Sequence, residues 1–283
     1  MSTRLFDCFT FFSEWEINLL LFRLNLLYNV VDFFVIVEGS HTHSGNEKEF
    51  IFGDHKEKFL PYMSKIIYIP IQFDLTNLVF VKANSYDPKN AANKLESQQR
   101  NAFSLINEKI NDTDLVMVSD LDELVNPNLL NQKDELYKNL ISIKRLTFEM
   151  DYNMYYMNNK CISGPNKTWR GAVITTGKQF KKTKPQKIRE SRTKNLFIEK
   201  SGWHCSFLGG FKQIKEKILS YSHTEYNKWE FIDEKHILEC VQEGKDIFNR
   251  EDYKYELQSI ANYPFNFNYL MTQFPNFYKS KHE

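Results

Sequence analysis

The sequence predicts an α/β fold with a mostly parallel central sheet, and three observations support this class. Apolar segments of strand length alternate with helical patterns along the first half of the chain. The strand segment 32–39 has a nearly continuous apolar run, as parallel strands have when both sheet faces are covered, and 112–119 is a further buried strand. The chain of 283 residues, 42% of them hydrophobic, can bury a sizeable core. Sheets of this class bind ligands at the carboxyl ends of their strands.

The elements of the first half follow from residue spacing. Ser13 is placed to cap a helix whose first turn is acidic and whose leucines recur at helical intervals. Leu95, Phe103 and Ile106 share one face of a later helix. The predicted elements, in order, are strand 4–11, helix 13–31, strand 32–39, strand 65–71, helix 93–110 and strand 112–119.

The second half of the chain has a different pattern, rich in β signals at first and helical later. No internal repeat or long linker separates the halves, so we predict a single domain over residues 1–283. The predicted elements are strands within 140–158 and 170–176, a turn at 163–169, helices at 209–223 and 230–248, and an aromatic tail at 262–278.

Charge and composition exclude several classes of partner. The 37 Lys and Arg residues nearly cancel the 36 Asp and Glu residues, so neither nucleic acid nor an anionic membrane is expected as the main partner. No segment has the length and hydropathy of a membrane span, and the amino terminus lacks a signal-peptide pattern. Four cysteines without a CxxC pair indicate reduced thiols. We therefore expect a cytoplasmic protein, in the host cytoplasm or the virion if its source is viral.

Three carboxylates stand at the end of the third buried strand, in DLVMVSDLDELVNP at residues 114–127. Asp120 and Asp122 alternate along an extended chain and so share one direction, about 6.5 Å apart. At that distance and an effective dielectric of ~20, two like charges repel by roughly 2.5 kcal/mol, so a partly buried pair needs a cation. Mg²⁺ or Mn²⁺ prefers such oxygen ligands. The alternative is a solvated turn or a helix start whose acids face the helix dipole.

Four blocks in this order, YNVVDFFVIVEGSHTHSG, ESQQRNAF, DTDLVMVSDLDELVNP and SGWHCSF, resemble glycosyltransferase family 17. This family includes the β-1,4-mannosyl-glycoprotein β-1,4-N-acetylglucosaminyltransferase. The resemblance implies a GT-A-like, Rossmann-type nucleotide-sugar-binding fold with a mixed central sheet. Its nucleotide-binding half would span about 1–140, and its acceptor-binding half, with the C-terminal helices, about 141–283.

The resemblance also implies a reaction, an inverting transfer that depends on Mn²⁺ or Mg²⁺. The donor would be a UDP-sugar, in the first place UDP-N-acetylglucosamine (UDP-GlcNAc), and the acceptor a glycan or glycoprotein. Two alternatives stay open. One is a nucleotidyl- or phosphotransferase on a similar sheet, although no GxxxxGK[ST] loop is present. The other is a catalytically inactive carbohydrate-binding relative.

Donor-binding roles fall on residues within the matching blocks. Asp120 and Asp122 would hold the metal that stabilises the leaving phosphates. Glu38, at the end of its strand, would contact the nucleotide base or ribose, or else only cap the next turn. Arg100 would reach the diphosphate or donor sugar as a forked cation. An ion pair with Glu96, one helical turn earlier, is the alternative for this arginine.

The remaining predicted roles lie closer to the acceptor. His204 is a candidate third metal ligand, or otherwise a hydrogen-bonded core residue. Trp203 would offer a flat face to an acceptor sugar, with core packing as the alternative. A general base must take the acceptor proton, and the candidates are Glu225, Asp233 and Glu123.

The basic segment 180–194 has two readings. It is either a patch for an anionic acceptor or phosphate, or a solvated helix and loop, which the sequence favours.

Overall fold

The computed structural model describes residues 3–81 and 84–280. Its strands are β1 (Leu5–Phe11), β2 (Phe33–Gly39), β3 (Ile66–Ile71), β4 (Leu115–Asp120), β5 (Glu123–Val125), β6 (Arg145–Met154), β7 (Asn159–Ser163), β8 (Thr168–Thr176), β9 (Leu196–Ile198), β10 (Gly202–Ser206) and β11 (Lys254–Leu257). Its α-helices are α1 (Ile17–Leu27), α2 (Ile51–Asp54), α3 (Ala91–Asn101), α4 (Pro127–Leu130), α5 (Lys133–Ile143), α6 (Gly177–Phe180), α7 (Pro185–Glu190), α8 (Phe211–Ser220), α9 (Trp229–Ile232), α10 (Glu234–Glu243) and α11 (Phe265–Gln273). The 3₁₀ helices are η1 (Glu14–Glu16), η2 (Lys56–Lys65), η3 (Ala102–Lys109), η4 (Ser191–Thr193), η5 (Thr224–Tyr226), η6 (Ile260–Asn262) and η7 (Pro275–Phe277).

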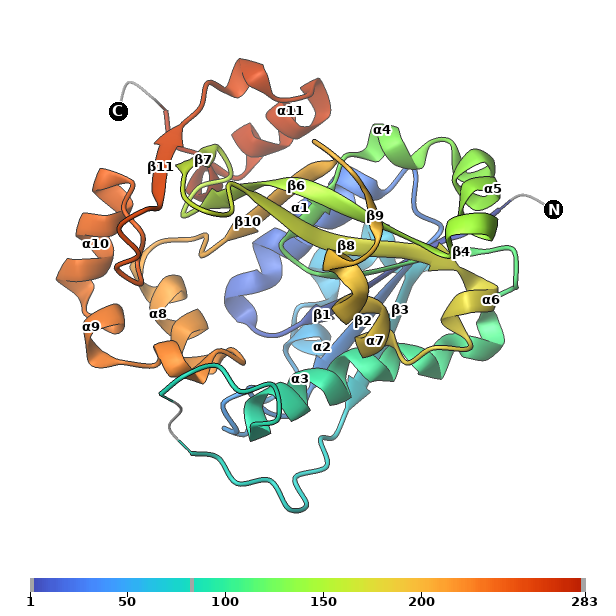
Figure 1. The fold of residues 1–283 in the computed structure, drawn as a ribbon, viewed down its shortest axis with the longest axis horizontal. Coiled ribbons are helices and arrows are strands. Elements are labelled where there is room, and N and C mark those ends of the chain that lie inside the picture. Colours follow the sequence, from blue (N-terminus) through green and yellow to red (C-terminus); the bar gives the residue numbers. More distant parts are fainter. Residues whose placement is uncertain (1–2, 82–83, 281–283) are drawn as a thin grey trace.

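The strands of the described residues join in one 11-stranded sheet, which the helices surround (Figure 1). The main order is β11-β7-β6-β8-β4-β1-β2-β3, with β9 and β10 attached to β6, and β5 attached to β10. Strands β4, β1, β2 and β3 are parallel, whereas β8 runs antiparallel to both β4 and β6. The predicted α/β class with a mixed central sheet is therefore confirmed.

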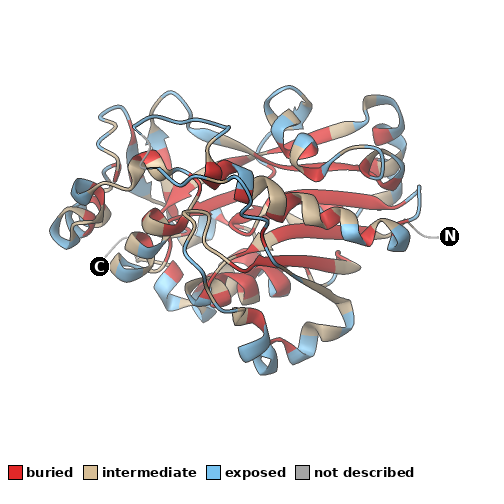
Figure 2. Cartoon of the chain, turned by 90° about the horizontal axis from the view of Figure 1, so that it is seen from below, coloured by how far each residue is buried: buried red, intermediate tan, exposed pale blue. Residues whose placement is uncertain are grey.

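Both faces of the parallel part of the sheet are buried, as the apolar runs predict. Alternate residues of β1 point to opposite sides: Leu5 and Phe9 pack toward α1 and α11, whereas Phe6 and Cys8 pack toward η3 and α7. Figure 2 shows the strands almost entirely buried, with exposed residues on the outer helices and loops. A third apolar cluster joins α8, α9 and α10 to β11.

Three helices differ from their predicted form. The predicted helix 93–110 continues past α3 as a 3₁₀ helix, and α5 occupies part of a segment predicted as strand. The predicted helix 230–248 is divided at Asp233, whose side chain accepts a hydrogen bond from His236 N and caps α10. No helix in the described ranges has the length and hydropathy of a membrane span.

The sheet has a topological switch point between β1 and β4. The chain proceeds from β1 to β2 and β3 on one side of β1, and then places β4 on the other side. Thr10 lies opposite Asp120 in this pairing, so the two strands end together. Open α/β sheets bind ligands in the crevice that forms at such a point.

Candidate functional site

A cavity of about 610 Å³ lies at the switch point between β1 and β4, within the size range of ligand pockets. Both halves of the chain form its wall. Asp120 is the last residue of β4, and Asp122 lies in the turn between β4 and β5, whereas Arg100 comes from α3, Arg189 from α7 and Lys217 from α8. The structure thus brings the predicted acidic pair and Arg100 together with two cations that the sequence did not single out.

The backbone of residues 120–123, called the acidic turn from here on, is bound by Arg23, a fully buried arginine of α1. Arg23 Nη1 donates to the carbonyl oxygens of Asp120, Leu121 and Glu123 at 3.1, 3.1 and 2.8 Å. Its charge is balanced by Asp7, a buried residue of β1, at 2.6 and 2.9 Å. Because this pair fixes the backbone of the turn, the directions of the acidic side chains are set before any ligand binds.

Asp120 is clamped between two arginines. Arg100 Nη2 donates to Asp120 Oδ1 at 2.7 Å, and Arg189 Nη2 donates to Oδ2 at the same distance. Burial alone would raise the pKa of Asp120, but the guanidinium groups of Arg189 and Arg100 outweigh it and hold the pKa well below its usual range. Arg100 also pairs with Glu96 at 3.1 Å, so the ion pair that was the alternative role for Arg100 is present as well.

Buried Glu123 binds Arg189, one of the two arginines that hold Asp120; we call Arg100, Arg189 and Asp120 the arginine clamp. The fully buried carboxylate of Glu123 accepts hydrogen bonds from Arg189 Nη2 and Trp169 Nε1, the latter at 2.7 Å, and from Asp120 N at 3.1 Å. A Cβ atom at Gly171 would lie 2.9 Å from the carboxylate carbon of Glu123, so this position has no room for a side chain. Glu123 does not line the cavity, and its bonds give it a structural role instead of the predicted role of a base.

Asp122 is held by a different kind of cation. Lys217 Nζ donates to Asp122 Oδ2 at 2.8 Å, and His204 Nδ1 lies 3.5 Å from Oδ1. Burial would raise the pKa of Asp122, but Lys217 and His204 lower it. Burial lowers the pKa of His204, although the Asp122 carboxylate acts against this. The ring of His204 stacks on Trp169, with 4.5 Å between centroids.

Two of the three predicted metal ligands fit a divalent cation. His204 Nδ1 is buried and has no hydrogen-bond partner among the described residues, and it faces a carboxylate. Asp120 does not fit, since both of its oxygens accept from arginines. In the described ranges, no three His, Cys, Asp or Glu side chains converge on a possible metal site. An ion on Asp122 and His204 would therefore need water or substrate phosphates as further ligands, as Mg²⁺ commonly does.

The cavity wall also carries cationic groups with unused donors. Burial lowers the pKa of Arg192 to about 10, which leaves it charged at pH 7. Within the described chain, no carboxylate pairs with Arg192, whose guanidinium lies 4.6 Å from the ring centre of Trp169. The Nε atoms of Arg100 and Arg189 are buried there without a hydrogen-bond partner. The guanidinium of Arg192, which lines the cavity and has no carboxylate partner among the described residues, fits an anionic ligand with several acceptor oxygens.

The C-terminal half contributes aromatic rings and a paired histidine. Tyr226 and Phe248 line the cavity and stack with 4.1 Å between centroids. His223 also lines it, and its Nδ1 lies 2.8 Å from Glu225 Oε1. Flat aromatic faces with polar edges suit the apolar face of a sugar ring. An imidazole whose second nitrogen is held by a carboxylate has the arrangement of a general base.

The loop after β1 forms another part of the wall. Phe12 and Trp15 line the cavity together with Glu16, whose carboxylate accepts a hydrogen bond from Phe12 N at 2.7 Å. Burial raises the pKa of Glu16 to about 8, although Lys217 acts against this. Gln99 fixes the loop relative to α3, because its Nε2 donates to Phe11 O and Val37 O at 3.0 and 2.9 Å.

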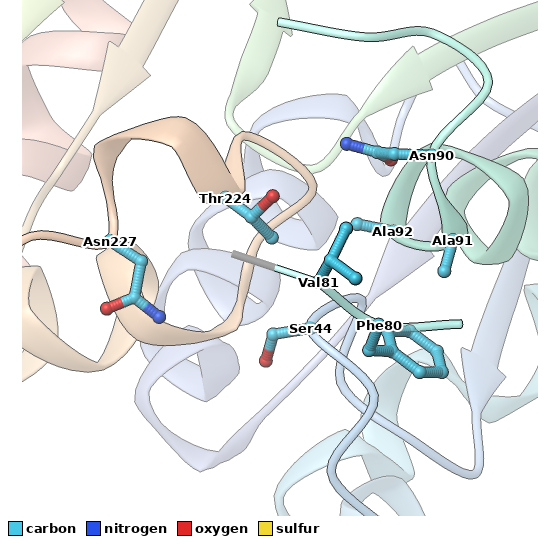
Figure 3. A pocket seen from close by; sticks show the side chains of 8 residues that line it. All are labelled: Ser44, Phe80, Val81, Asn90, Ala91, Ala92, Thr224 and Asn227. Atoms are coloured by element: carbon cyan, nitrogen blue, oxygen red, sulfur yellow. The ribbon is translucent and has the colours of Figure 1, made fainter. Parts of the chain in front are cut away.

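A smaller cavity of about 300 Å³ lies near the amino-terminal end of α3 (Figure 3). Figure 3 shows Thr224 and Asn227 on one side of it, and Val81 and Ala92 on the other. The described residues that line it carry no charged side chain.

Two predicted site residues lie away from the cavity. Glu38 is fully buried and accepts hydrogen bonds from Lys48 Nζ, Ile51 N, Phe52 N and Tyr68 Oη. Its acceptors are thus used within the protein. Trp203 is buried against Phe267, with 4.0 Å between ring centroids. The structure therefore places Glu38 in a structural network and Trp203 in the core, which was its alternative role.

The structure also places the predicted candidates for the general base in different surroundings. Asp233 caps α10 and does not line the larger cavity. Glu225 is buried behind His223, and its Oε2 has no hydrogen-bond partner within the described residues. Of the three predicted carboxylates, Glu225 contacts a histidine of the cavity wall, whereas Glu123 bonds to Arg189 and Trp169 and Asp233 caps α10.

Comparison with known proteins identifies one family. The model of glycosyltransferase family 17 matches residues 1–281 of this chain. No curated protein matches the sequence.

Several solved structures are similar at low identity. One is 4-diphosphocytidyl-2C-methyl-D-erythritol synthase, with a TM-score of 0.40 and 9% identity over 71% of this chain and 90% of that chain. Another is the galactosyltransferase LgtC in complex with donor and acceptor sugar analogues, with a TM-score of 0.34 and 12% identity over 67% of this chain and 64% of that chain. Mouse xyloside xylosyltransferase 1 has a TM-score of 0.33 and 11% identity over 69% of this chain and 74% of that chain.

Proposed function

The chain belongs to glycosyltransferase family 17, and from this premise we propose that it transfers a sugar, in the first place N-acetylglucosamine, from a UDP-sugar to a glycan hydroxyl. The observation that carries the proposal is the cavity at the switch point of the sheet, where cations with unused donors surround the acidic turn. A nucleotide diphosphate would supply the negative charge and the acceptor oxygens that these cations can bind.

The diphosphate would bind between Arg192, Lys217 and the arginine clamp. Of these cations, Arg192 has no carboxylate partner among the described residues, and the buried Nε atoms of Arg100 and Arg189 have no hydrogen-bond partner there. Guanidinium groups bind phosphate oxygens in forked pairs. As the bond to the sugar breaks, negative charge grows on the diphosphate, and preorganised donors stabilise it without reorganisation.

The divalent cation implied by the family would bind Asp122 and His204, and it would add positive charge at the leaving diphosphate. Asp120 would act differently. Since both of its oxygens are held by Arg100 and Arg189, it would position these arginines instead of binding the ion.

The acceptor would lie against the C-terminal half, beside Tyr226 and Phe248. There His223 would accept the proton of the attacking hydroxyl, with Glu225 fixing its tautomer and ring orientation through Nδ1. Glu225 would then contribute to catalysis through His223 and would not itself contact the acceptor.

The test is a screen of UDP-sugars for UDP release with Mn²⁺, repeated with Arg192→Met and with Lys194→Met as a matched control. Lys194 is exposed and lies two positions along the same segment. We expect UDP release from at least one UDP-sugar, and a loss of ~10-fold or more in kcat/KM for Arg192→Met, since a charge-assisted hydrogen bond contributes about 1.5–3 kcal/mol. If no UDP-sugar is bound or hydrolysed, the proposed function is wrong.

A further inference from the structure

We infer that Lys217 competes with the divalent cation for Asp122, so that the ion binds firmly only when a nucleotide diphosphate binds with it. This inference rests on the proposed function and concerns the same cavity. It assigns to Lys217 the role of a positioning residue that couples the two ligands.

Lys217 already bonds to one oxygen of the Asp122 carboxylate, and His204 lies beside the other oxygen, where an ion would bind. Lys217 Nζ is 2.8 Å from Oδ2, and the unpaired, buried His204 Nδ1 is 3.5 Å from Oδ1. A divalent ion taken up by Asp122 and His204 would therefore arrive next to an ammonium that already neutralises the same carboxylate. Two cations on one carboxylate repel each other, and each lowers the affinity of the other.

Lys217 can leave Asp122 without losing every favourable contact. Its ammonium also donates to Ser206 Oγ at 3.3 Å, and it lies 5.0 Å from the ring centre of Phe207. Lysine is a point charge on a flexible stem, whereas an arginine fork is bound to one geometry. The ammonium is therefore free to turn from the carboxylate toward a phosphate oxygen in the same cavity.

A diphosphate removes the conflict because it brings new negative charge. Lys217 then bonds to the diphosphate, and Asp122 becomes available to the ion. By thermodynamic reciprocity, the nucleotide must strengthen binding of the ion by the same factor as the ion strengthens binding of the nucleotide. Removing the charge of Lys217 must reduce this factor.

The experiment measures binding and not turnover. Mn²⁺ is titrated into the whole protein without nucleotide, by calorimetry or by the electron paramagnetic resonance of free Mn²⁺. UDP is titrated in chelator and, separately, in saturating Mn²⁺. The proteins are the wild type, Lys217→Met, Lys217→Gln and the control Lys212→Met, an exposed position on the same helix.

The expected effects of the two Lys217 variants have opposite signs. Mn²⁺ alone should bind ~10-fold or more tightly than in the wild type, because a competing charge is gone. UDP in chelator should bind ~10-fold or more weakly, because a phosphate-binding cation is lost. General damage to the site would weaken both ligands. Lys212→Met should match the wild type.

Unchanged or weaker Mn²⁺ binding in both Lys217 variants, in proteins that unfold as cooperatively as the wild type, would overturn the inference. This result is distinguishable from a failure of the proposed function. The function fails if the wild type binds UDP neither with nor without Mn²⁺, whereas the role of Lys217 fails if UDP binds and Mn²⁺ affinity does not respond.

Discussion

The two carboxylates of the acidic turn lie two positions apart, yet they are held in different ways. Asp120 is bound by Arg100 and Arg189 at 2.7 Å each, and buried Glu123 binds Arg189 from the opposite side. Asp122 is bound by Lys217 and approached by His204. On the Asp120 side, two guanidinium groups bond to the two carboxylate oxygens, whereas on the Asp122 side one ammonium bonds to one oxygen and His204 Nδ1 lies 3.5 Å from the other. The difference separates a part that fixes the site from a part that responds to ligand.

The largest expected effect is on stability, at the arginine clamp. Arg189→Met leaves Asp120 with a single arginine and leaves buried Glu123 without its cation. Breaking a buried ion pair from one side costs about 3–5 kcal/mol. Urea unfolding should show a loss of this size for Arg189→Met and a smaller loss for Lys217→Met, because Arg189 bonds to two carboxylates and Lys217 to one. Equal losses would erase the distinction between the two sides.

The next effect is on turnover, at Asp122. Asp122→Asn keeps an acceptor for Lys217 but removes the charge that would hold a cation. We expect kcat to fall by about 10²–10³-fold, the usual cost of losing one preorganised electrostatic contact to a transition state. Circular dichroism should show an unchanged fold. Normal turnover in Asp122→Asn would place the ion, or the reaction, elsewhere.

A third pair, His223 and Glu225, extends the comparison to proton transfer. His223→Gln should lower kcat by about 10²-fold, and Glu225→Gln by about 10-fold, because the first removes the base and the second only its orientation. His55→Gln, a histidine outside the cavity wall, serves as the control. A larger loss for Glu225→Gln would make the carboxylate itself the base.

The smallest effect concerns pH and Glu16. Its pKa in the folded protein is about 8, above its ordinary value of 4.5, because burial disfavours the charged form. With respect to this group, folding stability is therefore highest below pH 4.5, and it declines as the pH rises from 4.5 to about 8. Glu16→Gln should raise the free energy of unfolding at pH 9 and leave it unchanged at pH 4. An equal change in the free energy of unfolding at pH 4 and at pH 9 would contradict the raised pKa of Glu16.

The sequence predicted the parallel strands β1 to β4 and the position of the acidic pair, because both depend on local patterns, whereas β5, β7, β9, β10 and β11 were not predicted. A buried strand followed by Asp120 and Asp122 placed these acids at a ligand-binding edge, and the structure shows a cavity there. The partners of the acids were missed. Lys217 lies on an amphipathic helix where it resembles a surface residue, and Arg189 belongs to a basic segment that was read as solvated.

Two further residues show what the sequence alone could and could not indicate. Arg23 is the one basic residue in a helix otherwise rich in leucine, INLLLFRLNLL, and that isolation could have indicated a buried ion pair. Glu38 follows a strand just as Asp120 does, yet its oxygens are used by Lys48, Tyr68 and backbone donors. Only the tertiary structure shows which strand-end acid faces a cavity.

The most direct measurement is a crystal structure of the protein with UDP and Mn²⁺. The account predicts the diphosphate beside Arg192 and Lys217, manganese on Asp122 and His204, and an unchanged clamp of Asp120 by Arg100 and Arg189. Nucleotide bound away from the switch point of β1 and β4, or an acidic turn in which Asp122 still pairs with Lys217 and holds no manganese, would contradict it.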